Sequence, residues 1–149
     1  MQNFFDSHPE ILWVIAAIVA ASVLCVGGVI MSRLSGWFDL SKTFRLVGAF
    51  DGISDGAQRV QMRYGIRYGL RLGANENGLY LAVPFLFRFM HPPLFVPWNE
   101  IKMHKAQTTF GEHFVLTLGR ELHIPLRLSR ATVTMLQDGA GKHWLKAHS

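Results

Sequence analysis

The most regular spacing of charged side chains in this sequence belongs to arginine. Apolar and polar residues alternate from Arg59 to Leu72, and this period of two predicts one long, half-buried strand. Gly65 and Gly69 lie on its polar face and indicate a bulge or a sharp bend. A row of guanidinium groups on that face could bind anionic lipid or a partner, and it could equally be the solvated face of an antiparallel sheet. This arginine ladder consists of Arg59, Arg63, Arg67 and Arg71.

Other residue types that carry chemistry show no spacing typical of a site. The histidines contain no HExxH motif or similar ligand spacing, the single cysteine excludes a disulfide framework, and the carboxylates are scattered. The run GAGKH at 139–143 lacks the GxxxxGK[ST] spacing of a phosphate-binding loop. We therefore expect no catalytic residue, no metal site and no cofactor. The rival hypothesis is an enzyme whose pocket assembles only in three dimensions, near His91, Trp98 and His104.

The elements that position these residues begin with an uncharged stretch from Ile11 to Met31. Its 21 residues would rise about 31 Å as a helix, enough to cross the hydrocarbon core of a bilayer. The tail at 1–10 contains Asp6 and Glu10 but no Lys or Arg, so the positive region of a signal peptide is missing and we expect the helix to be retained. All 15 Lys and Arg residues follow the span, which places the tail outside and the rest of the chain in the cytoplasm.

Small residues form a stripe along this span. They are spaced at i, i+4, i+8 and i+11, where another helix could approach closely. A monomeric anchor with an incidental stripe is the alternative. The stripe consists of Ala17, Ala21, Cys25 and Gly28.

The part of the chain after the span is distinctly basic. Residues 32–149 hold 15 Lys and Arg against 8 Asp and Glu, a net charge of +7. Half of the chain is hydrophobic and only 17% is charged, which indicates one small folded domain. Such a charge favours a position close to an anionic membrane leaflet. No nucleic-acid-binding motif accompanies it, so we expect no nucleic-acid partner.

Residues 32–57 are expected to form a juxtamembrane helix and a loop. Trp37, Leu40, Phe44 and Val47 recur at helical spacing, so this helix either lies in the membrane interface or packs on the domain. Trp37 and Phe38 are candidates for lipid or partner contact as interfacial aromatics. The two Asp-Gly pairs between residues 48 and 56 indicate a loop.

Residues 58–149 are expected to form a β-rich domain. Asn77-Gly78 predicts a two-residue hairpin turn that pairs Leu72 with Val83 and continues the second strand through Phe87. The prolines at 92, 93 and 97 exclude a central strand and indicate a crossing segment or an edge, with Trp98 as an anchor.

The rest of the domain is expected to add three strands and a helix. The first strand runs from residue 101 to 109, and a hairpin with a three-residue loop follows, placing Leu118 opposite Leu122. Ser129 is the expected N-cap of a helix over residues 130–137, and Trp144 is a buried or interfacial residue of the basic tail.

Together these elements predict an α+β protein: one transmembrane helix, then a small, mostly antiparallel β barrel or sandwich with a C-terminal helix. This layout resembles the pleckstrin-homology and GRAM superfold. The motifs SGWFDL at 35–40, GLYLAV at 78–83 and HPPLFVPWNEI at 91–101 are similar to uncharacterised bacterial single-pass membrane proteins with such a domain. The resemblance implies the bacterial inner membrane and lends no activity.

Two non-enzymatic functions follow. The first is a membrane-anchored interaction module whose basic domain lies on the inner leaflet. The second is an accessory or scaffold subunit of a larger membrane complex, such as a bioenergetic or photosynthetic assembly. The expected partners are membrane lipid and other membrane subunits or a second copy of the chain.

Overall fold

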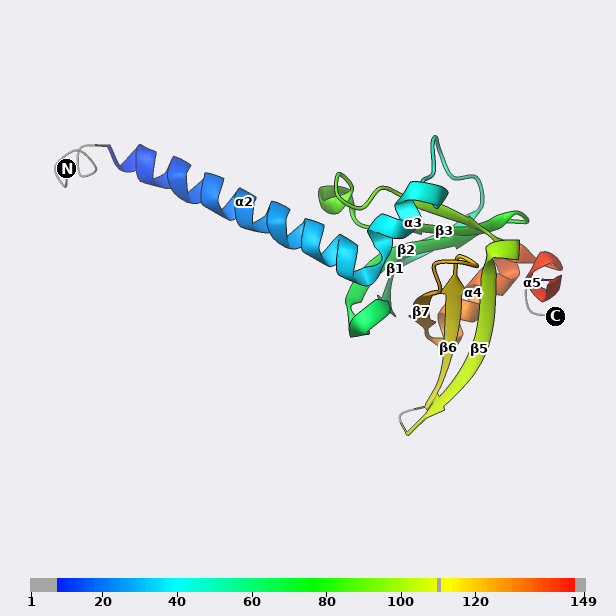
Figure 1. The fold of residues 1–149 in the computed structure, drawn as a ribbon. Helices are drawn as coiled ribbons and strands as arrows, with labels where there is room; N and C mark the ends of the chain where they lie inside the picture. The colour runs from blue at the N-terminus through cyan, green and yellow to red at the C-terminus, as the bar shows by residue number, and fades with distance from the viewer. Residues whose placement is uncertain (1–7, 110, 147–149) are drawn as a thin grey trace.

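A single long helix, α2 (Pro9–Ser35), projects from the domain that the rest of the chain forms (Figure 1). The computed structural model describes residues 8–109 and 111–146. Pro9 begins the helix, where its missing N–H costs no hydrogen bond. The helix is long and apolar enough to cross a membrane, and none of its most apolar window is buried inside the protein. The predicted span thus lies within one continuous helix, while residues 1–7 of the predicted tail lie outside the described residues.

Within the described residues, seven antiparallel strands form one sheet, in the order β4-β3-β2-β1-β7-β6-β5. The sheet is open, with β4 and β5 at its edges, so the expected barrel does not close. The strands are β1 (Ile53–Gln61), β2 (Arg67–Ala74), β3 (Gly78–Ala82), β4 (Leu94–Pro97), β5 (Ile101–Thr108), β6 (Gly111–Leu118) and β7 (Ile124–Leu128).

The predicted long strand is in fact two strands, β1 and β2, joined by the turn η1 (Arg63–Gly65). Tyr64 and Gly65 adopt φ angles of 58° and 74°, which reverse the chain. The prediction of one strand was wrong because the period of two continues unchanged through the turn. Gln61 pairs with Arg67, so each side chain stays on the face that the alternation gave it. The strand β1 also begins at Ile53, within the expected loop, and its register shifts between Ser54 and Ala57.

The hairpin of β2 and β3 has a longer turn than expected. Leu72 pairs with Leu81 instead of Val83, a shift of two residues that keeps the apolar faces together. The side chain of Asn75 accepts hydrogen bonds from the backbone N–H groups of Asn77 and Gly78 and stabilises this wider turn. The strand β3 then ends at Ala82, because Pro84 cannot donate to the sheet.

The proline-rich segment forms the edge strand β4, as the sequence predicted. After it, η3 (Trp98–Glu100) leads into β5, and Trp98 is buried with its Nε1 donating to the Asn75 carbonyl at 2.9 Å. The anchoring role predicted for Trp98 is confirmed.

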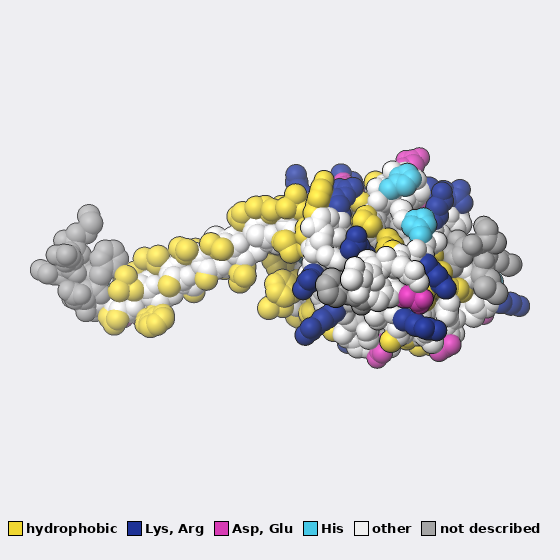
Figure 2. All heavy atoms as spheres, turned by 90° about the horizontal axis from the view of Figure 1, so that it is seen from below, with side chains coloured by type: hydrophobic (Ala, Val, Ile, Leu, Met, Phe, Trp, Pro, Cys, Tyr) yellow, Lys and Arg dark blue, Asp and Glu magenta, His cyan; other side chains and the backbone are white. Residues whose placement is uncertain are grey.

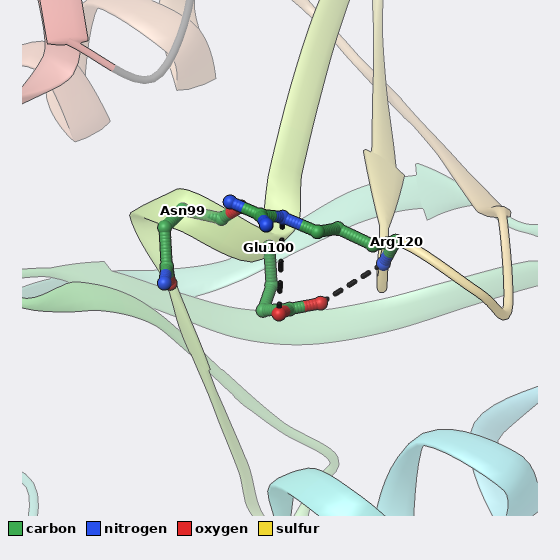
Figure 3. A network of polar contacts seen from close by, with 3 residues as sticks. All are labelled: Asn99, Glu100 and Arg120. Atoms are coloured by element: carbon green, nitrogen blue, oxygen red, sulfur yellow. Dashed lines mark hydrogen bonds and ion pairs between the residues drawn. The ribbon is translucent and has the colours of Figure 1, made fainter.

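The hairpin of β6 and β7 is also wider by two residues than predicted, with Leu118 opposite Ile124. Its turn is held to η3, as Figure 3 shows. The Arg120 N–H donates to a Glu100 carboxylate oxygen at 2.9 Å, and the Arg120 Nε donates to the Asn99 carbonyl at 2.8 Å. These bonds hold the turn between β6 and β7 in place, at the other end of β6 from the β5–β6 turn.

The C-terminal helix α4 (Arg130–Ala140) packs on β1, β2 and β6. The Ser129 side chain accepts from the Thr132 N–H, as expected of an N-cap. The helix continues three residues beyond the predicted end and stops at Gly141. A short helix, α5 (His143–Lys146), brings Trp144 edge-on against Trp98, with ring centroids 5.3 Å apart.

Candidate membrane-contact site

The apolar helix α2 is joined to the domain by α3 (Trp37–Phe44). Gly36 ends α2 with a φ angle of 86°, and a side chain there would collide with Ile124. The side chains of Trp37 and Leu40 are fully buried in the core of the domain, and the Trp37 Nε1 donates to the Pro92 carbonyl at 3.0 Å. The sequence left open whether this helix lies in the membrane interface or packs on the domain. In the structure it packs on the domain.

This packing removes Trp37 from the proposed lipid-contact residues, since its ring has no exposed surface. Phe38 keeps an exposed ring, with the guanidinium of Arg33 and the ammonium of Lys42 at 4.9 and 4.5 Å from its centroid. Phe38 therefore remains able to contact lipid. Val47, the last of the four apolar residues predicted to recur along this helix, is exposed on a loop after it.

A partly buried polar cluster fixes the end of α2 on the sheet. The hydroxyl of Tyr68 lies 3.0 Å from the Ser35 Oγ, 3.1 Å from the His91 Nε2 and 3.3 Å from the Met31 carbonyl. Burial raises the pKa of Tyr68, partly offset by the Ser35 hydrogen bond, and burial lowers the pKa of His91, partly offset by the Phe87 carbonyl. Both side chains thus favour the neutral form, and the cluster holds the helix without charge.

An exposed apolar segment lies beside this junction. It follows Pro84, includes the turn η2 (Phe85–Phe87), and exposes large side chains to solvent. We call it the aromatic loop; it consists of Phe85, Leu86, Phe87 and Phe89, which are 84%, 73%, 47% and 72% exposed.

The residue after the aromatic loop fastens it to α2. A Cβ on Gly28 would collide with the Met90 Sδ, so a larger residue at position 28 would displace the methionine side chain from its place against the helix. The Ser32 Oγ also donates to the Met90 carbonyl at 3.3 Å. Gly28 belongs to the apolar span, so the loop lies at the level of the last turn of the span. Figure 2 shows hydrophobic side chains continuing from the helix onto the adjoining end of the domain, with basic side chains beyond them.

The arginine ladder is distributed over three elements. Arg59 is on β1, Arg63 is in the turn η1, and Arg67 and Arg71 are on β2. The strand pairing places Arg59, Arg67 and Arg71 on one face of the sheet, because Arg59 pairs with Gly69 and Gln61 pairs with Arg67. Arg63 instead lies near the ring of Tyr64, 5.9 Å from its centroid.

The small-residue stripe on α2 is only partly open. Ala17 and Ala21 are exposed and Cys25 is half-exposed, whereas Gly28 is covered by Met90 of the same chain. This contact takes Gly28 out of any face available to a second helix.

Within the described residues, the three side chains named for an enzymatic pocket share no hydrogen-bond or ring partner. His91 belongs to the Tyr68 cluster, Trp98 packs on Trp144, and His104 lies on β5 with its Nε2 3.4 Å from the Thr117 hydroxyl. Among residues 8–109 and 111–146, no group of three His, Cys, Asp or Glu side chains could hold a metal ion.

Comparison of the chain with protein-family models and with curated proteins gave no match. The class of protein is therefore taken from its own structure: residues 8–109 and 111–146 form an α+β protein with one apolar helix long enough to span a membrane and an open antiparallel sheet. An apolar loop of the domain lies beside that helix.

The aromatic loop is the feature that the sequence reasoning missed. Phe85 and Phe87 were expected to continue a strand, because they are spaced by two. Two signals argued against that interpretation: Pro84 precedes the segment, and Leu86, between Phe85 and Phe87, makes a run of three consecutive apolar residues that breaks the alternation.

Proposed function

We propose that this protein is a non-enzymatic, single-pass membrane protein whose pleckstrin-homology-like domain lies on the cytoplasmic face of a bacterial inner membrane and serves there as an interaction module. The observation that carries the proposal is the aromatic loop beside α2. Exposed apolar patches of this kind mark membrane or protein contacts. Its attachment to Gly28, inside the span, favours the membrane.

Insertion of the loop would contribute substantially to holding the domain on the bilayer. Full burial of a Phe or Leu side chain contributes about 1.5–3 kcal/mol. The loop exposes four such side chains. If partial insertion gains about 1.5 kcal/mol from each of them, their sum is several kcal/mol. The backbone around them can enter only the interfacial layer, because an irregular loop leaves hydrogen-bonding groups that need water.

Charge supports the cytoplasmic side. The described acidic residue before the span, Glu10, contrasts with the basic domain that follows it. Arg88 within the aromatic loop and Arg33 at the end of α2 have stems long enough to reach phosphate groups while their neighbours enter the apolar layer. The expected geometry is a domain held at three places: the span, the aromatic loop and its basic surface.

The experiment places a fluorescent label at Phe85→Cys in the full chain carrying Cys25→Ala, reconstituted into vesicles. Lipids with a nitroxide near the headgroup should quench this label, and its emission should shift to the blue. Val47→Cys is the matched control, since Val47 is an apolar and exposed residue on a different loop. Equal quenching and equal emission at the two positions would refute the membrane contact.

An accessory subunit is the second candidate, because the exposed side of α2 includes Ala17 and Ala21. Replacing both with Leu should leave insertion intact and reduce copurification of membrane partners in mild detergent. Gly28 is unsuitable for this test, because a larger residue would displace Met90 within the same chain. Unchanged copurification would leave α2 as an anchor only.

A further inference from the structure

A groove lies on the domain where the two portions of the sheet meet. The strands β1–β4 and β5–β7 run at a steep angle to one another (Figure 1), and β1 and β7 share one residue pair, Gln61 with Arg127. An open groove of about 880 Å³ lies where the two portions diverge. Residues of β1, β2, β5, β6 and β7 line it, among them Arg59, Arg67, His113 and Arg127.

The charged side chains of this groove are all basic. Arg59, Arg67 and Arg127 are exposed, and His113 adds an imidazole. Within the part of the chain that the structure describes, no carboxylate lines the groove and none of these arginines forms an ion pair. Three like charges without a counterion repel each other, and an anion in the groove would relieve that repulsion.

The strand register gathers these arginines around one point. Gln61 pairs with Arg67 on one side and with Arg127 on the other, so the two arginines share a face. Their backbones are about 10 Å apart, two strand spacings. Arg59 lies on the same face, two residues before Gln61. Opposite Arg59 is Gly69, where an added Cβ would meet nothing within 4 Å, so the surface is open at that position.

We propose that this groove binds a phosphate group, held by Arg59, Arg67 and Arg127. A guanidinium offers two parallel N–H donors to two oxygens of a phosphate, and two or three of them can surround one group. Arg71, in contrast, shares the strand and face of Arg67 but does not line the groove. The phosphate belongs either to a lipid headgroup or to a soluble compound.

The groove lies partly on β2, the strand that also contacts the end of α2. Arg67 lines the groove, and the next residue, Tyr68, has its side chain on the other face of the sheet, where its hydroxyl donates to the Met31 carbonyl at the end of the span. A lipid headgroup as ligand therefore rests on the proposed function, which places that end at the bilayer surface. Binding of free phosphate does not depend on it.

The test uses the full chain in nanodiscs and measures hydrogen exchange of the β1 and β7 amides. One arm adds inorganic phosphate to discs of zwitterionic lipid, with sodium chloride at equal ionic strength as its reference. The other arm replaces part of the lipid with phosphatidic acid. In at least one arm, exchange should slow in the wild type and in Arg71→Gln. Arg67→Gln and Arg127→Gln should each weaken the binding that causes this protection about tenfold or more, which is the scale of one charge-assisted hydrogen bond.

The arms separate the two sources. Protection by inorganic phosphate supports a soluble ligand, and protection by phosphatidic acid alone supports a lipid headgroup. Gly69→Glu, which places a carboxylate opposite Arg59 without a strained backbone, should abolish either response. The proposal is overturned if neither arm slows hydrogen exchange of the β1 and β7 amides, or if Arg71→Gln reduces this protection as much as Arg67→Gln does. Because the label at Phe85 reports membrane contact separately, the two proposals can fail independently.

Discussion

Replacing Trp37 with Ala tests whether α3 belongs to the core of the domain. The Trp37 side chain is fully buried and its Nε1 donates to the Pro92 carbonyl at 3.0 Å. Truncating a buried Trp to Ala costs about 3–5 kcal/mol, and losing the hydrogen bond adds about 1 kcal/mol. We therefore expect the free energy of unfolding to fall by about 4–6 kcal/mol, a large part of the stability of a small domain.

The assay is thermal unfolding of the full chain in mild detergent, followed by the circular dichroism of the sheet. At about 2–4 °C per kcal/mol, Tm should fall by about 10–20 °C. Trp37→Phe keeps a ring and loses the hydrogen bond, so its Tm should lie between those of the wild type and Trp37→Ala. Phe38→Ala is the matched control, because Phe38 is the neighbouring aromatic with an exposed ring. If Trp37→Ala lowers Tm no more than Phe38→Ala does, α3 is not part of the core and the reasoning is refuted.

Two further changes probe the junction between the helix and the domain. Burial lowers the pKa of His91 in the folded state below its unfolded value of about 6.5. The unfolded state therefore binds the proton more tightly, and the free energy of unfolding should fall as the pH drops below about 6.5. His91→Gln should flatten this dependence in thermal unfolding, whereas the exposed His104→Gln should not; equal slopes in both variants would contradict the assignment. Gly28→Leu should displace the aromatic loop and reduce lipid quenching of the label at Phe85 without impairing insertion. Gly27→Leu is its control, since a Cβ there meets nothing within 4 Å, and equal quenching in the two variants would show that Gly28 does not position the loop.

Local patterns were sufficient for several elements of the fold. The uncharged span, the Ser129 N-cap and the edge position of the proline-rich segment depend on residues that are close in sequence. Each has a short-range cause: absence of charge over the length of a bilayer, a side-chain oxygen near free N–H groups, and missing N–H donors. Sequence reasoning therefore placed them correctly.

The strand registers required the tertiary structure. A period of two cannot distinguish registers that differ by two residues, because both keep the apolar faces together. The hairpins of β2 with β3 and of β6 with β7 each differ from the prediction by two residues. The turn at Tyr64 and Gly65 was hidden for the same reason, since alternation continues on both sides of it.

The candidate sites depended most on contacts between distant residues. An apolar helical stripe suits a core or a membrane surface equally, and only packing against Pro92 and Tyr68 placed Trp37 in the core. The sequence by itself showed an uncharged stretch long enough to span a membrane and a row of arginines. Only the tertiary structure brought Arg127 to that row and set Met90, the residue after the aromatic loop, against Gly28. Each contact joins segments about 60 residues apart, and local patterns carry no information over that separation.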